Sequence, residues 1–193
     1  MSERGSYAKG VAKREEILRT ALEVFSREGY RGTSLREVAR ASGLSLPGLM
    51  HYFDSKEDLL AAILKKRDER DEDTYRRHEA PLAALAAVMR HNAEVPGLVQ
   101  LYATLSAAAS DPEHPAHEYF VERYASFRTQ FAEDIRGRQA DGTVPASLDA
   151  DKLAASMIAL ADGIQVQWML DPSIDMADHI DFLWSTLTGQ AGA

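Results

Sequence analysis

The chain has no cysteine among its 193 residues, which excludes disulfide bonds and thiolate metal ligands. Its six histidines are scattered and lack the HExxH spacing of a zinc site, so we expect no metal and no cofactor. A nucleophile and base at catalytic spacing and a phosphate-binding loop are also missing. An enzyme that uses Asp162, Gln165 and His91 is therefore the weaker hypothesis, and we expect a protein that is not an enzyme.

Long apolar runs are absent as well. No run of about 18 apolar residues is present, which is the length that spans a bilayer. The first sixteen residues, MSERGSYAKGVAKREE, are polar and basic without the apolar core of a signal peptide. With 45% hydrophobic residues the chain can still bury a core. We therefore expect a globular, cytoplasmic protein with no membrane partner.

Positive charge is scarce overall, since the formal net charge is -8, and it is unevenly placed. Residues 1–56 contain ten Lys or Arg and seven Asp or Glu, whereas residues 57–193 contain 12 basic and 23 acidic residues. A basic first quarter on an acidic body is typical of a protein that approaches a polyanion with that quarter alone. Chance variation of surface charge is the alternative. A sequence-indifferent DNA-binding protein fits less well, because such binding needs many phosphate contacts.

The apolar residues recur at helical spacing and show no strand-type alternation. A charged segment, 65–79, is interpreted as the solvated end of the fourth helix and a connector. The pattern predicts an all-α fold with helices at about 12–28, 34–41 and 46–53, one that starts at Asp54 or Ser55, and others at 80–92, 96–110, 115–139, 150–170 and 176–188.

The segment SGLSLPGLMHYF, residues 42–53, punctuates the helices with glycine and proline. Before it, Gly29 is a plausible left-handed cap of the first helix, and Ser34 with Glu37 has capping-box spacing. Within it, Ser45 can cap a third helix whose first turn contains Pro47, where a missing N–H costs nothing. Two short helices joined by a tight turn indicate a helix-turn-helix unit.

Residues 14–64 resemble the DNA-binding domain of the TetR family of one-component transcriptional regulators. The matching positions are Ala21 and Phe25, Gly29, Gly32-Thr33-Ser34, Ala39, Gly43, Ser45, Leu49, His51-Tyr52-Phe53 and Ser55-Lys56-Glu57. The resemblance implies a homodimer that binds double-stranded operator DNA. It implies an N-terminal three-helix DNA-binding domain, residues 1–56, and a helical ligand-binding and dimerisation domain, residues 57–193. A small-molecule effector would lower operator affinity, which makes the protein a repressor.

The family commonly carries a lysine, a small residue and a threonine where this chain has Leu46-Pro47-Gly48. Base readout should then depend on shape and thymine methyl contact, with polar anchors to phosphate. The DNA-binding candidates are Thr33, Ser34, Arg36, Ser45, Leu46, Pro47, Gly48, His51, Tyr52 and Lys56. For Tyr52 a purely structural ring is the alternative, and for His51 a solvated helix end. Arg4, Lys9 and Lys13 form either a flexible arm that reaches a groove or a solubilising tail. Because Leu46-Pro47-Gly48 departs from the family pattern, a helical small-molecule-binding module without operator binding is the alternative function.

An aromatic stripe in the C-terminal part points to either core packing or a pocket wall. Phe120, Tyr124, Phe127 and Phe131 share one face of a predicted helix. The family resemblance shifts some of them toward a cavity for a small apolar or aromatic effector. The pocket candidates are Met89, Tyr102, Tyr124, Phe127, Phe131 and Trp168. Asp162 either meets a cationic ligand group or pairs with an arginine.

The segment 153–170, LAASMIALADGIQVQWML, is apolar on most of its circumference. A helix of that kind must bury more than one face. We expect one face to serve the core and the other to join helix 176–188 in a two-fold four-helix interface. The dimer-interface candidates are Ile158, Gln165, Ile180, Leu183, Trp184 and Leu187.

Overall fold

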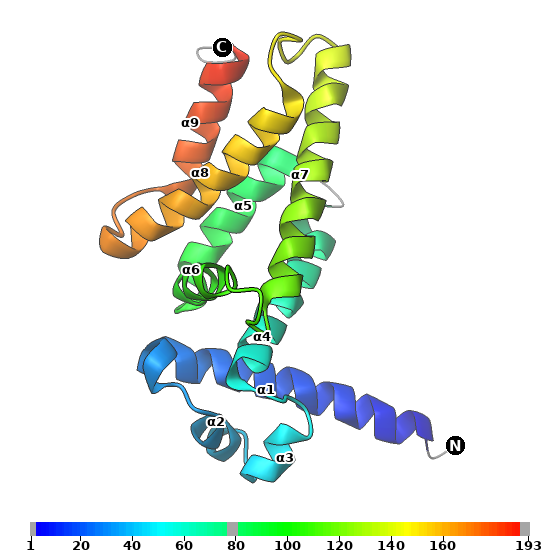
Figure 1. Cartoon of the computed structure of the whole chain (residues 1–193), viewed down its shortest axis with the longest axis vertical. Coiled ribbons are helices and arrows are strands. Elements are labelled where there is room, and N and C mark those ends of the chain that lie inside the picture. Colours follow the sequence, from blue (N-terminus) through cyan, green and yellow to red (C-terminus); the bar gives the residue numbers. More distant parts are fainter. Residues whose placement is uncertain (1–2, 77–80, 190–193) are drawn as a thin grey trace. The chain divides into compact units, whose positions relative to one another are not determined.

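The protein is described by a computed structural model that covers residues 3–76 and 81–189. Every regular element in these ranges is helical, which confirms the all-α prediction. In chain order the elements are α1 (Glu3–Gly32), α2 (Leu35–Ala41), α3 (Leu46–Met50), α4 (Lys56–Asp71), the π-helical turn η1 (Glu72–Arg76), α5 (Pro81–Glu94), α6 (Leu98–Ala108), α7 (His117–Ala140), α8 (Ala150–Leu170) and α9 (Met176–Thr188) (Figure 1).

The chain forms two compact units that do not follow its order. The first unit contains residues 1–68 and 96–117, and the second contains residues 69–95 and 118–193. Residues 96–117 join the first unit because α6 packs against α1. The predicted functional boundary between residues 56 and 57 stays a prediction.

The first unit is organised around the apolar face of α1. Ile17, Ala21 and Phe25 are fully buried there, as are Leu49 of α3 and Phe53 just beyond it. Figure 1 shows α2 and α3 side by side, and α2 packs against α1. A short helix cannot hold its own conformation in water, so this packing is what stabilises α2 and α3. The helix-turn-helix arrangement predicted from the sequence is thus present.

Three details of this unit differ from the sequence-based expectations. The first helix begins at Glu3 and includes Lys13, whose Nζ donates to Glu16 and to the carbonyl of Ser42, so Lys13 is not part of a flexible arm. The third helix ends at Met50, because His51 is its C-cap. Segment 65–79 is not wholly solvated: Arg67 is buried, ion-paired with Asp68 at 2.7 Å and stacked over Tyr102.

The second unit packs α5 and α8 against α9, with α7 in the same unit. Its core contains Met157 and Ala154 of α8 together with Ile180 of α9, all fully buried, and Ile135 of α7 at 2% exposure. By length and mean hydropathy alone α8 is long and apolar enough to cross a membrane. This is weak evidence, since a buried core helix passes the same test, and α8 contributes eight buried residues to the unit.

Candidate functional site

The start of α2 carries the Ser34 half of the predicted capping box, while the Glu37 carboxylate lies near two arginines rather than bonding back to Ser34 in the described part of the chain. The Oγ of Ser34 accepts a hydrogen bond from the backbone N–H of Glu37 at 3.3 Å, which satisfies one of the free amides of the helix N-terminus. The Glu37 carboxylate lies 3.7 Å from Arg27 and 3.9 Å from Arg40. The exposed guanidinium of Arg36 makes no ion pair within the described ranges. Arg36 is therefore available to a phosphate group.

Local interactions also fix the turn between α2 and α3 and the start of α3. Gly43 has a φ of +66°, which a residue with a side chain rarely adopts, and it lets the chain reverse between α2 and α3. Ser45 caps α3 by accepting from the N–H of Gly48 at 3.2 Å, and Pro47 occupies the first turn. A Cβ added to Gly48 would lie 3.2 Å from that Ser45 oxygen. The small residue therefore keeps the cap tight.

The predicted DNA-binding residues differ in how far their side chains are exposed to solvent. Exposed are Ser34, Arg36, Ser45, Pro47 and His51, and half-buried are Leu46, Gly48, Tyr52 and Lys56. Met50 was missed by sequence reasoning, yet 48% of it is exposed on α3. Its spacing of three residues from Pro47 was the signal, because residues three apart share a helix face. We call Ser34, Arg36, Ser45, Pro47, Met50 and His51 the reading surface.

Two of the predicted DNA-binding side chains are engaged inside the unit. Thr33 is only 2% exposed, and its hydroxyl donates to the carbonyl of Gly29 at 2.8 Å. The Nζ of Lys56 donates to the carbonyl of Tyr30 at 2.8 Å and lies 4.1 Å from the centre of its ring. Either side chain would have to leave these contacts to reach DNA, so both are omitted from the reading surface.

Tyr30 and Glu57 complete the link between α1 and α4. The Tyr30 hydroxyl donates to Glu57 at 3.1 Å. Burial of the ring, followed by this hydrogen bond to the carboxylate, raises the pKa of Tyr30 above its usual value. The phenol therefore stays protonated at neutral pH and keeps donating.

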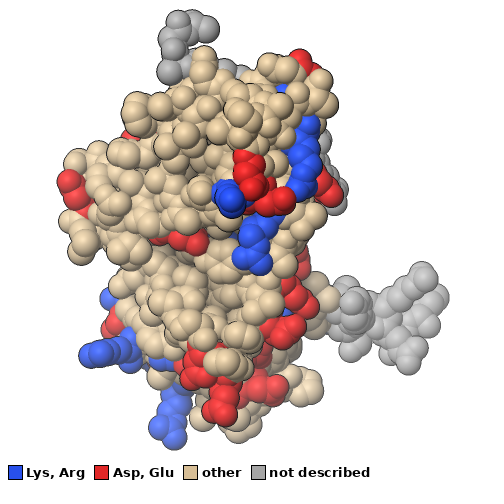
Figure 2. All heavy atoms as spheres, turned by 45° about the horizontal axis from the view of Figure 1, so that its top comes forward, with Lys and Arg blue, Asp and Glu red and all other residues tan. Residues whose placement is uncertain are grey.

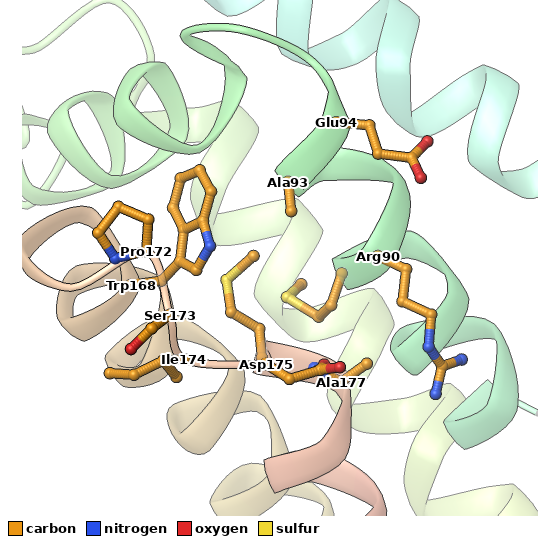
Figure 3. A pocket seen from close by; sticks show the side chains of 11 residues that line it. Arg90, Ala93, Glu94, Trp168, Pro172, Ser173, Ile174, Asp175 and Ala177 are labelled. Atoms are coloured by element: carbon orange, nitrogen blue, oxygen red, sulfur yellow. The ribbon is translucent and has the colours of Figure 1, made fainter.

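Met89 and Trp168 are brought together in a pocket of about 390 Å³ in the second unit. Figure 3 shows the indole of Trp168 beside Pro172, with two methionine side chains near it. The lining residues are Met89, Arg90, Ala93, Glu94, Trp168, Pro172, Ser173, Ile174, Asp175, Met176 and Ala177. Of the six pocket candidates, this pocket includes Met89 and Trp168. It also includes the α8–α9 loop and the start of α9, which sequence reasoning missed because no periodicity links a loop to a distant helix.

The other four pocket candidates do not line this pocket. Phe131 is buried in the second unit, and Arg123 lies 4.2 Å from the centre of the Phe127 ring. Tyr124 donates from its hydroxyl to Asp162 at 2.7 Å, so the carboxylate meets a tyrosine rather than an arginine in this contact. Tyr102 lies on α6 in the first unit, buried under Arg67.

The predicted dimer residues mostly serve the core of their own chain. Ile158, Gln165, Ile180 and Trp184 are buried at 7%, 2%, 0% and 7% exposure, whereas Leu183 is half-buried and Leu187 is 37% exposed. The inward face of α9 takes Ile180 and Trp184, which are four residues apart. Four large apolar side chains of α8 and α9 are exposed at the surface. They are Val166 and Leu170 of α8, with 49% and 84% exposure, and Phe182 and Leu187 of α9, with 66% and 37% exposure. We call these four the apolar face.

Comparison with known proteins gives the family. Residues 17–63 match the model of bacterial regulatory proteins of the tetR family, and residues 78–183 match that of the C-terminal part of BetI-type transcriptional repressors. The HTH-type transcriptional regulator RutR of Escherichia coli strain K12 is 38% identical over 87 residues, which cover 44% of this chain and 41% of RutR. The chain therefore spans about two fifths of the length of that curated relative.

Solved structures agree on the fold. A TetR transcription regulator from Haloarcula marismortui superposes with a TM-score of 0.77 at 19% identity, over 93% of this chain and 98% of the other. FadR from Bacillus subtilis, solved in complex with stearoyl-CoA, has a TM-score of 0.68 at 18% identity, over 93% of this chain and 98% of that one. Such identities establish the fold alone. With the helix-turn-helix unit and the two family matches, they show that the chain belongs to the TetR family of transcriptional regulators.

Proposed function

We propose that the protein is a repressor that binds a palindromic operator as a homodimer and leaves it when a small apolar or aromatic molecule binds. The observation that carries this proposal is the reading surface, in which two serine-capped helices present exposed polar and apolar side chains. We propose residues 1–56 as the DNA-binding part, residues 57–193 as the ligand-binding and dimerising part, and the cytoplasm as its location.

The chemistry of the reading surface favours contact by shape and methyl groups. Pro47 and Met50 are exposed apolar side chains on α3, and such groups pack against the C5-methyl of thymine in the major groove. Ser34 and Arg36 at the start of α2 are suited to phosphate oxygens, which position the protein without reading sequence. We therefore expect an operator with thymines opposite α3 and few arginine contacts to guanine.

The distribution of charge supports selective rather than indifferent DNA binding. On the face shown in Figure 2, basic and acidic side chains lie among one another and broad areas carry neither. Sequence-indifferent binding depends on many simultaneous phosphate contacts, and residues 1–56, with ten basic and seven acidic residues, supply few of them. Specific recognition by two copies of a small reading surface fits these charges better.

Dimerisation is supported by the apolar face. Large exposed apolar side chains on neighbouring helices are unusual on a monomer and mark interaction surfaces. A two-fold interface between α8 and α9 and their copies would cover all four residues and form a four-helix layer. Two reading surfaces would then meet two half-sites, as palindromic operators require.

Selection of genomic fragments by the purified protein tests the proposal. The selection is done at about 150 mM salt, where exposed charges more than about 8 Å apart are largely screened. Recovery of one or a few fragments that share a palindrome, bound by two chains, is the expected result. Recovery of no DNA, or of DNA without a shared motif, would favour the helical ligand-binding module that lacks an operator.

A matched pair of variants then assigns the contacts. Arg36→Ala should weaken binding to every fragment and reduce the slope of log K against log salt by about 0.9, the value for one phosphate contact. Arg128→Ala, which removes an exposed arginine from α7 in the second unit, should change neither quantity. Equal losses in both variants would mean that long-range charge, rather than the reading surface, drives the binding.

A further inference from the structure

The pocket beside Trp168 combines polarisable apolar side chains with polar groups. Met89 and Met176 are buried at 5% and 3% exposure, and Trp168 is half-buried between the pocket and the solvent. Thioether sulfur and an indole face both favour contact with an aromatic ring. The volume of about 390 Å³ lies within the range of small-molecule sites, about 300–1,000 Å³.

The charged groups at the rim are mainly acidic. Arg90 is already paired with Asp181 at 3.0 Å, which leaves it partly neutralised. Glu94, one turn further along α5, is exposed and makes no ion pair within the described residues. Asp175 lies opposite, where its Oδ1 caps α9 by accepting from the N–H groups of Ala177 and Asp178. Figure 3 shows Arg90 and Glu94 on the same side of the pocket, pointing outward. The rim therefore attracts a cation more than an anion.

We propose that this pocket binds a planar aromatic molecule that carries an amino group, with the ring against Trp168 and the two methionines and the amine at the rim, where Glu94 and Asp175 lie. The inference rests on the proposed function, since it names the effector class for that function. It also separates this chain from its structural neighbour in complex with stearoyl-CoA. A polyanionic coenzyme A ester would bring its phosphates to a rim that holds two carboxylates.

Isothermal titration calorimetry with ligands that share one ring system tests the proposal on the full-length protein without DNA. The probes are 1-naphthylmethylamine, 1-naphthalenemethanol and 1-naphthoate, with lauroyl-CoA as a fourth. The amine should bind at least about tenfold tighter than the naphthoate, because the partly screened rim charges attract one and repel the other. Equal affinities of amine and naphthoate, tighter binding of lauroyl-CoA, or binding of none of the four would overturn the proposal.

Three variants locate the site. Ala93→Trp fills the pocket from an exposed position on α5, so it should abolish binding of the amine and leave the helical circular dichroism unchanged. Glu94→Gln should weaken the amine several-fold and leave 1-naphthalenemethanol unaffected. Glu133→Gln, at an exposed position of α7 that does not line the pocket, is the matched control and should bind like wild type. Unchanged affinity of Ala93→Trp would place the ligand elsewhere and refute the assignment.

The readout also separates this inference from the regulatory function. If the amine binds the pocket and releases the selected operator, both proposals are supported. If the amine binds and the operator complex is unaffected, the site assignment holds and the role of this ligand as effector fails. If an operator is found and the amine does not bind, the protein is a regulator and the proposed ligand class is wrong.

Discussion

Replacing Gly97 with alanine should destabilise the protein strongly, because two separate constraints act at that position. Gly97 is the N-cap of α6 and has φ +79° and ψ -10°, a left-handed conformation. A Cβ built there would lie 2.8 Å from the Cα and 2.9 Å from the Cβ of Ser26 on α1. Since a backbone atom cannot rotate away, Gly97→Ala must push α6 and α1 apart within the first unit.

The expected loss of stability in Gly97→Ala is the sum of a backbone term and a packing term. A residue with a side chain pays about 1–2 kcal/mol in the left-handed region, and overpacking a tight contact costs a further 1–3 kcal/mol or so. The sum of about 2–5 kcal/mol corresponds to a fall in Tm of roughly 5–15 °C for a chain of this length. Melting followed by circular dichroism at 222 nm measures it.

Gly142→Ala is the matched control. Gly142 has φ +80°, nearly the same as Gly97, but a Cβ there would meet nothing within 4 Å. It should lose only the conformational term, about 1–2 kcal/mol. The difference between the two variants therefore measures the contact with Ser26. Equal losses in Tm would refute the close approach of α6 to α1, and a loss confined to Gly142→Ala would refute the reasoning altogether.

Three further outcomes are expected. Pro47→Ala should bind the selected operator but discriminate less against substituted half-sites in a gel-shift competition, whereas a uniform loss on all DNA would assign Pro47 to positioning. If the proposed dimer forms, Phe182→Glu should convert it to a monomer in sedimentation velocity, since the loss of about 1.5–3 kcal/mol of phenyl burial from each copy weakens association by at least about 100-fold. Val121→Glu, at an exposed position of α7, should associate like wild type. The backbone N–H of Lys152 lowers the pKa of Asp149, the cap of α8, so this carboxylate stabilises the fold above its ordinary pKa of 3.8 and loses that contribution as the pH falls through the lowered value. Asp149→Asn keeps the cap without the charge, so its Tm should fall less than that of wild type over this acidic range, and parallel curves would contradict the assignment.

The reading surface was largely readable from the sequence because its determinants are local. A serine three residues before an amide that it caps, a proline in a first turn and a glycine at positive φ all act within a few residues of one another. The spacing of Ser34 and Ser45 therefore predicted both caps. Exposure was less predictable, since Thr33 and Lys56 match the pattern of DNA-contacting residues yet contact Gly29 and Tyr30.

The residues of the pocket and of the proposed dimer interface could not be predicted fully from the sequence, because they depend on contacts between distant segments. Met89 and Trp168 were pocket candidates through the family resemblance, but their proximity to the loop before α9 depends on how α5, α8 and α9 pack. The sequence assigned Ile180, Leu183, Trp184 and Leu187 of helix 176–188 to the interface and did not show which of them point inward. Packing decided this, burying Ile180 and Trp184 and leaving Phe182 outside.

By itself, the sequence determined the helical fold and the helix-turn-helix unit, because helix periodicity and capping depend on neighbouring residues. Membership of a regulator family followed from the resemblance of residues 14–64 to that family. Only the tertiary structure decided that α6 belongs with α1, that α1 extends to Glu3, and which apolar side chains remain at the surface. The physical reason is that burial is a property of two surfaces together. A single helix can show that it has an apolar face, but only the helix that packs against it determines which side chains are covered.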